Sequence, residues 1–94
     1  MAVAVTMEIP GGTLAQYDEV LALMGFENGG KGAPGGLFHW AAATEGGIVV
    51  TDVWETMEQF EAFATEKILP YVAQVGLTPG EPKIYEVHAY VTAG

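Results

Sequence analysis

The 94-residue sequence contains no cysteine, no serine and no arginine, and its only basic residues besides histidine are Lys31, Lys67 and Lys83. Without cysteine or serine, the chain has no disulfide, no thiolate metal site and no serine or cysteine nucleophile. Without arginine, it lacks the bidentate group that binds phosphate and carboxylate substrates. The formal net charge of −9 predicts no binding to nucleic acid or to anionic membranes, because both depend on clustered Lys and Arg.

Long hydrophobic runs are also missing, although half of the residues are apolar. No run approaches the roughly 20 residues that cross a bilayer. Residues 1–9 lack the cationic start of a secretory signal, so we expect a cytoplasmic protein. The length suits a single domain over residues 1–94, near the low end of what buries a self-sufficient core. So high an apolar content in so small a chain favours a homodimer, in which a second copy covers exposed apolar surface.

Alternating apolar residues predict four strands, at residues 2–9, 37–44, 48–54 and 83–91. Glu45-Gly46, between the second and third strands, favours a tight hairpin. This turn sets a register in which Leu37 opposes Trp54. In the same register His39 opposes Asp52, which brings their Cβ atoms to roughly 5 Å from each other.

Two capping boxes, each a threonine followed three residues later by a glutamine, predict two helices. The first helix begins after Thr13 and closes near Gly25, and the second begins after Thr56. Pro70 predicts a kink at the residue before it, followed by a short helical turn that ends at Gly76. The order β-α-β-β-α-β predicts an α+β, ferredoxin-like antiparallel sheet with both helices on one face.

The period of two along each strand divides the side chains between the two faces of the sheet. We expect the helices to cover a mostly apolar set: Val3, Val5, Met7, Ile9, Phe38, Trp40, Val49, Val53, Val87, Ala89 and Val91. The opposite face then collects the polar and aromatic candidates Thr6, Glu8, His39, Asp52, Trp54, Glu86, His88 and Tyr90. Because apolar residues share this second face, we expect another subunit to close over it; they are Leu37, Ala41, Ile48, Val50 and Ile84.

The chain resembles the dimeric α/β barrel superfamily, and within it the small antibiotic-biosynthesis-monooxygenase-like proteins. The resemblance rests on the junction from Asp52 to Phe60, on the hairpin from Leu37 to Gly47, and on the last strand with His88. It implies a homodimeric barrel that holds an apolar or aromatic small molecule. The chemistry it implies ranges over cofactor-free monooxygenation, haem degradation, cyclisation and isomerisation.

Trp54 matches the junction tryptophan of both the monooxygenase and the haem-degrading branches. The haem-degrading type also has an asparagine in the first strand and a histidine on the second helix, and this chain has neither. The phenol-oxidising type uses an asparagine near the tryptophan and a later arginine, whereas the one asparagine here is Asn28, in a glycine-rich loop.

His39 and Asp52 are the candidate catalytic residues. A carboxylate bonded to an imidazole fixes its tautomer and raises its basicity, which suits a general base; the alternative is a polar pair that only satisfies the hairpin. Trp54 either stacks on a planar substrate or fills the sheet edge. Tyr17 is assigned to helix packing, with a hydroxyl that could line a cleft. The other candidates for substrate binding are Thr6, Glu86, Tyr90 and His88, the last alternatively a polar residue of the dimer interface.

Three functions are compatible with these residues. The first is an enzyme without a cofactor that deprotonates an aromatic or polyketide-type molecule through His39 and Asp52, as a step towards oxygenation, cyclisation or isomerisation. The second is a non-catalytic ligand-binding or accessory dimer of the same fold. The third is a metal- or haem-dependent protein, but no close-spaced ligand motif accompanies the two histidines, so we expect neither metal nor cofactor.

Overall fold

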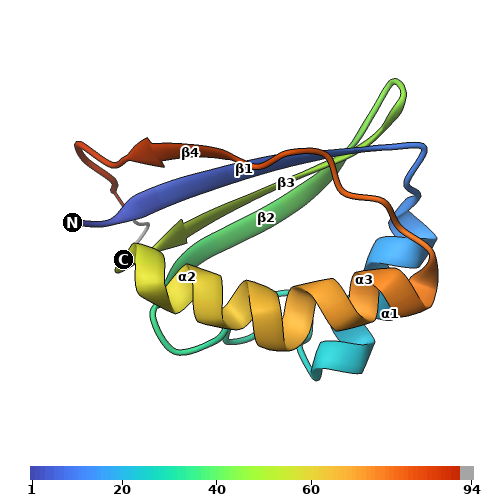
Figure 1. Cartoon of the computed structure of the whole chain (residues 1–94), viewed down its shortest axis with the longest axis horizontal. Coiled ribbons are helices and arrows are strands. Elements are labelled where there is room, and N and C mark those ends of the chain that lie inside the picture. Colours follow the sequence, from blue (N-terminus) through green and yellow to red (C-terminus); the bar gives the residue numbers. More distant parts are fainter. Residues whose placement is uncertain (92–94) are drawn as a thin grey trace.

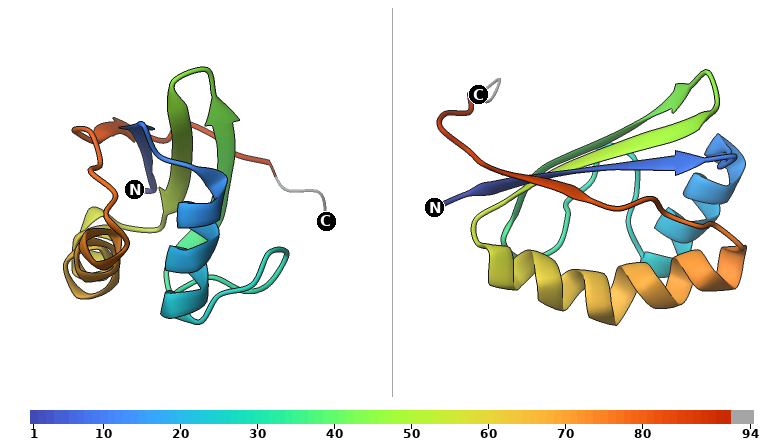
Figure 2. Two further views of the ribbon diagram at one scale, coloured as in Figure 1. Left: turned by 90° about the vertical axis from the view of Figure 1, so that its right-hand side faces the viewer. Right: turned by 45° about the horizontal axis from the view of Figure 1, so that its top comes forward.

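The computed structural model describes residues 1–91, which form a four-stranded antiparallel sheet with helices on one face (Figures 1 and 2). The strands lie in the order β2-β3-β1-β4 and are β1 (Val3–Pro10), β2 (Gly36–Thr44), β3 (Gly47–Trp54) and β4 (Lys83–Glu86). The α-helices are α1 (Leu14–Met24), α2 (Met57–Phe63) and α3 (Leu69–Val75). The predicted α+β, ferredoxin-like fold is confirmed. Residues 92–94, the end of the expected domain, lie outside the described residues.

Both predicted helix starts are confirmed. At α1 the capping box is complete: the Gln16 N–H donates to the Thr13 hydroxyl at 3.1 Å, and the Thr13 N–H donates to the Gln16 side-chain oxygen at 3.0 Å. At α2 the Gln59 N–H donates to the Thr56 hydroxyl at 3.2 Å, but the Gln59 side chain accepts from that hydroxyl instead of from the backbone. Gly25 ends α1 with φ +82°, a left-handed conformation that favours glycine.

Pro70 was expected to disfavour the helical conformation at Leu69, but Leu69 keeps helical angles of φ −59° and ψ −47°. The helix continues from α2 into α3 through the π-helical segment η1 (Ala64–Ile68), and Figure 1 shows one unbroken ribbon. Proline offers no N–H to the preceding turn and its ring crowds the carbonyl there, so a widened π turn directly before Pro70 accommodates it. Of the helices in residues 1–91, none is long and apolar enough to span a membrane.

The core lies between the sheet and the helices, in two clusters of buried residues. One cluster, under α1 and α3, consists of Ile9, Val20, Ile48, Val72 and Leu77. The other, under α2, consists of Val3, Val5, Trp54 and Phe60. Ile48 and Trp54 begin and end the same side of β3, so this side of the strand is the one that the helices cover.

The faces predicted for β2 and β3 are therefore wrong. Val5 pairs with Asp52 and Val3 with Trp54, so both β3 residues lie on the helix-covered face with the β1 residues assigned there correctly. Phe38 and Trp40 lie on the other face, which we call the uncovered face. Both sides of these strands carry apolar residues, so the alternation separates two sets without showing which one the helices cover.

Strand β4 is shorter than predicted, and its faces are also inverted. It ends at Glu86, and residues 87–91 have no regular structure. Ile84 pairs with Val5 and Glu86 with Val3, which places both on the helix side. One backbone hydrogen bond to the neighbouring segment follows the strand, from the Val87 N–H to the Ala2 carbonyl at 2.9 Å.

Candidate active site

The β2–β3 hairpin brings the two predicted catalytic residues together. His39 pairs with Asp52 and Ala43 with Ile48, so the predicted register is confirmed along most of the hairpin. It fails at one end, where Trp54 pairs with Gly36 across a β-bulge that leaves Leu37 as the extra residue. The side chains of His39 and Asp52 both point to the helix-covered face.

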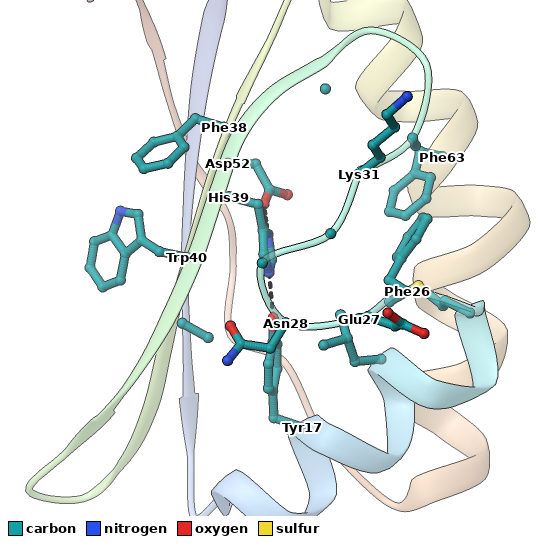
Figure 3. Close-up of a pocket in the computed structure, with 18 of the residues that line it drawn as sticks. Tyr17, Phe26, Glu27, Asn28, Lys31, Phe38, His39, Trp40, Asp52 and Phe63 are labelled. Atoms are coloured by element: carbon teal, nitrogen blue, oxygen red, sulfur yellow. Dashed lines mark hydrogen bonds and ion pairs between the residues drawn. The ribbon is translucent and has the colours of Figure 1, made fainter. Parts of the chain in front are cut away.

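His39 has a hydrogen-bond partner at each ring nitrogen, and Figure 3 shows the three side chains in a row. An ionised Asp52 can only accept, so His39 Nδ1–H donates to Asp52 Oδ1. In the neutral ring Nε2 then carries the lone pair, and the Tyr17 hydroxyl donates to it at 2.5 Å. Helix α1 thus supplies a third member, and the site is a Tyr–His–Asp chain.

The three members of this chain differ in exposure and in charge. The Asp52 side chain is 11% exposed and the His39 side chain 42% exposed. Burial raises the pKa of the Tyr17 hydroxyl above its ordinary value of 10.0, and the nearby carboxylates of Asp52 and Asp18 raise it further. Tyr17 therefore keeps its proton at neutral pH and is a donor to His39.

Beside this chain lies a cavity of about 670 Å³, between α1, the hairpin and the glycine-rich loop that follows α1. Tyr17, His39 and Asp52 all line it. The opposite wall includes two aromatic rings: Phe26 stacks on Phe63 with ring centroids 5.9 Å apart, and Figure 3 shows both across from the Tyr–His–Asp chain, next to Glu27 and Lys31. A polar, hydrogen-bonded wall facing an aromatic one suits a planar molecule with an ionisable group.

Trp54 lines the same cavity but lies largely in the core. Its ring centroid is 5.1 Å from that of Phe63 and 6.1 Å from that of Phe60. Its indole N–H is buried without a hydrogen-bond partner among residues 1–91. Trp54 therefore belongs to both the core and the cavity, at the end of an inner strand of the sheet, and its unpaired donor carries a desolvation cost.

The remaining predicted substrate-binding residues do not join this cavity. Glu86, His88 and Tyr90 are exposed at or beyond the end of β4. Thr6 lies on the uncovered face opposite Thr51 and lines a separate hollow of about 140 Å³. In residues 1–91 no three His, Asp or Glu side chains gather closely enough to hold a metal ion.

Tyr17 is the site residue that the sequence assigned to packing. Its position on the apolar stripe of α1 is real, because its ring packs against the core cluster under α1 and α3. The signal that could have identified it is a hydroxyl at the tip of a core-facing side chain, beside a strand that carries an imidazole.

This fold is shared with several solved structures. A protein from Chloroflexus aurantiacus J-10-fl, assigned as an antibiotic biosynthesis monooxygenase, superposes with a TM-score of 0.68 at 18% identity, over 100% of both chains. SnoaB, a cofactor-independent oxygenase from Streptomyces nogalater, gives 0.61 at 19% identity, over 96% of this chain and 95% of SnoaB. A protein from Deinococcus radiodurans, also assigned as an antibiotic biosynthesis monooxygenase, superposes with a TM-score of 0.57 at 12% identity, over 100% of this chain and 99% of the other.

None of the protein-family models matches the sequence, and neither does any curated protein. The likeness is therefore one of structure, and at these identities it establishes the fold. The chain has the fold of the antibiotic-biosynthesis-monooxygenase-like proteins, as the resemblance implied.

Proposed function

We propose that this protein is a cofactor-independent enzyme that deprotonates an aromatic or polyketide-type small molecule, with His39 and Asp52 as its general base pair. The observation that carries the proposal is the hydrogen bond between His39 and Asp52 in the wall of an aromatic cavity. The carboxylate stabilises the imidazolium that forms when the ring takes a proton. The fold shared with SnoaB, itself a cofactor-independent oxygenase, supports the same class of chemistry.

Deprotonation leaves an electron-rich anion, and its fate defines the overall reaction. With dioxygen as co-reactant, a CH₂ group is oxidised to a carbonyl and one water leaves. Without dioxygen, the same anion attacks a carbonyl within the molecule or is reprotonated at another carbon, which gives cyclisation or isomerisation. Measuring dioxygen consumption beside the absorbance of the substrate separates these outcomes.

The test is turnover of a panel of polycyclic phenols and β-polyketones by the wild type and by His39→Gln. We expect His39→Gln to lower kcat about a hundredfold, the lower range for loss of a general base. Binding, measured by tryptophan fluorescence, should change much less. Asp52→Asn should lower kcat in the same direction, since it removes the charge that stabilises imidazolium.

Glu45→Gln is the matched control, because it neutralises an exposed carboxylate at the turn of the same hairpin, outside the cavity. Full turnover by His39→Gln would refute the general base. Ligands that bind with no turnover by the wild type would favour the non-catalytic binding protein instead.

We also propose that the protein acts as a homodimer, joined through the uncovered face. That face presents three large exposed side chains: Phe38, Trp40 and Tyr85. Leu37, Ala41, Val50 and Ile84, which the sequence suggested for this role, do not form that surface. Apolar surface of this kind on a small chain favours a partner, and a second copy is the partner always present.

Light scattering at micromolar concentration should give the mass of a dimer for the wild type and of a monomer for Trp40→Glu. The control is Leu69→Glu, which places the same charge on an exposed apolar side chain of α3 and should leave the dimer intact. A monomeric wild type would contradict the proposal.

A further inference from the structure

His39 has no free nitrogen with which to meet a substrate. Its Nδ1–H is bonded to Asp52, and its Nε2 lone pair is occupied by the Tyr17 hydroxyl at 2.5 Å. The remaining ring atoms of the imidazole are carbons, which accept no proton. A base that works through Nε2 needs either the loss of this bond or the participation of Tyr17.

The geometry favours participation. The rings of Tyr17 and His39 are nearly parallel, at 11°, with centroids 6.0 Å apart, so the hydroxyl approaches Nε2 from the edge of the imidazole, where the lone pair lies. The Tyr17 ring is held by the core cluster under α1 and α3, and the residue lines the cavity. The second lone pair of its oxygen remains available to a hydrogen-bond donor in the cavity.

We propose that Tyr17 is the catalytic residue that meets the substrate, and that the substrate presents a phenolic hydroxyl to it. The substrate O–H bond breaks as the substrate proton moves to the Tyr17 oxygen. At the same time the original O–H bond of Tyr17 breaks, and the proton of Tyr17 moves to His39 Nε2. The products are a substrate phenolate and an imidazolium bonded to Asp52. Tyr17 is neutral before and after the step, so no tyrosinate accumulates.

This inference rests on the proposed base pair and narrows the substrate class. A hydroxyl is a good partner for the relay, because it donates to the Tyr17 oxygen along one short hydrogen bond. The aromatic wall formed by Phe26 and Phe63 then accommodates the ring that carries the hydroxyl. A molecule without such a hydroxyl occupies the cavity but gives no proton to Tyr17.

The test uses 4-nitrophenol, whose phenolate is coloured, at a pH where the free probe is mostly neutral. Bound to the wild type, the probe should absorb as phenolate. Bound to Tyr17→Phe, which keeps the packed ring and removes only the hydroxyl, it should absorb as neutral phenol, because the edge of that ring still lies in front of Nε2 and has no proton to pass on. Tyr71→Phe is the matched control, because Tyr71 also packs on that core cluster but does not line the cavity, and its phenolate signal should equal that of the wild type.

A second measurement needs no variant. In wild-type protein with ¹⁵N-labelled histidine, binding of the probe should shift His39 Nε2 from the bare to the protonated nitrogen signal. Phenolate that persists in Tyr17→Phe, or an Nε2 signal that does not change, would overturn the relay. If His39→Gln abolishes turnover of the panel while Tyr17→Phe does not, the proposed function stands and the relay alone fails. If the wild type takes the proton from the probe but turns over no molecule of the panel, the relay stands and the proposed function fails.

Discussion

Replacing Gly47 with alanine should lower the free energy of unfolding by about 3 kcal/mol, the upper range for an overpacked site. Gly47 begins β3 beside the end of β1, and a Cβ there would overlap the Ile9 carbonyl oxygen and come within 2.9 Å of the Gly11 nitrogen. Both are backbone atoms, so no side chain can turn away to relieve the clash. Domains of this kind are stable by about 5–15 kcal/mol, so the loss is a large part of the total.

Urea unfolding followed by circular dichroism measures this loss, and Gly46→Ala is the control. A Cβ on Gly46 meets nothing within 4 Å, and Gly46 does not have a positive φ. Alanine there restricts the unfolded chain and should leave stability unchanged or raise it by up to about 1 kcal/mol. Equal urea midpoints for Gly47→Ala and Gly46→Ala would contradict this prediction. They would show that the end of β1 moves away from the added methyl group at little cost in stability.

The same hairpin shows what the sequence can predict. His39 and Asp52 lie close together in the sequence, and Glu45-Gly46 marks the turn between them. Counting residues back from this turn therefore predicts that they pair. The two threonine caps are equally local signals, and both are confirmed. The pairing of His39 with Asp52 and the two helix starts were therefore predictable to the residue.

The orientation of the hairpin depends on contacts that no local signal contains. Asp52 was expected on the face away from the helices, because the alternation assigned Val49 and Val53 to the covered face. It is buried because His39 bonds it, and His39 is in turn bonded by Tyr17 from a helix that precedes the hairpin. Tyr17, His39 and Asp52 hydrogen-bond one another on the helix-covered face. The neighbouring residues of β2, Phe38 and Trp40, therefore lie on the uncovered face.

The site was predictable to the same extent as the fold. The pair of His39 and Asp52 follows from register within one hairpin. Tyr17 enters only when α1 packs over β2, a contact between elements whose faces the alternation left undecided. Thr6 was grouped with the pair through the inverted faces and lies on the uncovered one. Glu86 lies on β4, at the sheet edge opposite β2, and His88 and Tyr90 lie beyond that strand, so none of the three reaches the cavity.

The two tryptophans give the sharpest test of this orientation. Trp54 is 4% exposed and packs on Phe60 and Phe63, whereas Trp40 is 44% exposed on the uncovered face. Trp54→Ala should therefore cost about 3–5 kcal/mol, the usual loss for a buried aromatic side chain truncated to alanine. The sequence alone predicted the reverse, with Trp40 in the core, so thermal or urea unfolding of Trp54→Ala and Trp40→Ala decides between the two orientations.

Two further comparisons isolate the cause. Trp54→Phe should cost far less than Trp54→Ala, because phenylalanine keeps an aromatic ring against Phe60 and removes an indole N–H that has no partner in residues 1–91. Any loss in Trp40→Ala should grow with protein concentration if Trp40 lies in the proposed dimer contact, whereas the loss in Trp54→Ala should be the same at every concentration. A larger loss of unfolding free energy in the monomer for Trp40→Ala than for Trp54→Ala would contradict this orientation. Phe38 and Trp40 would then face the helices, and Tyr17, His39 and Asp52 would not line the cavity together.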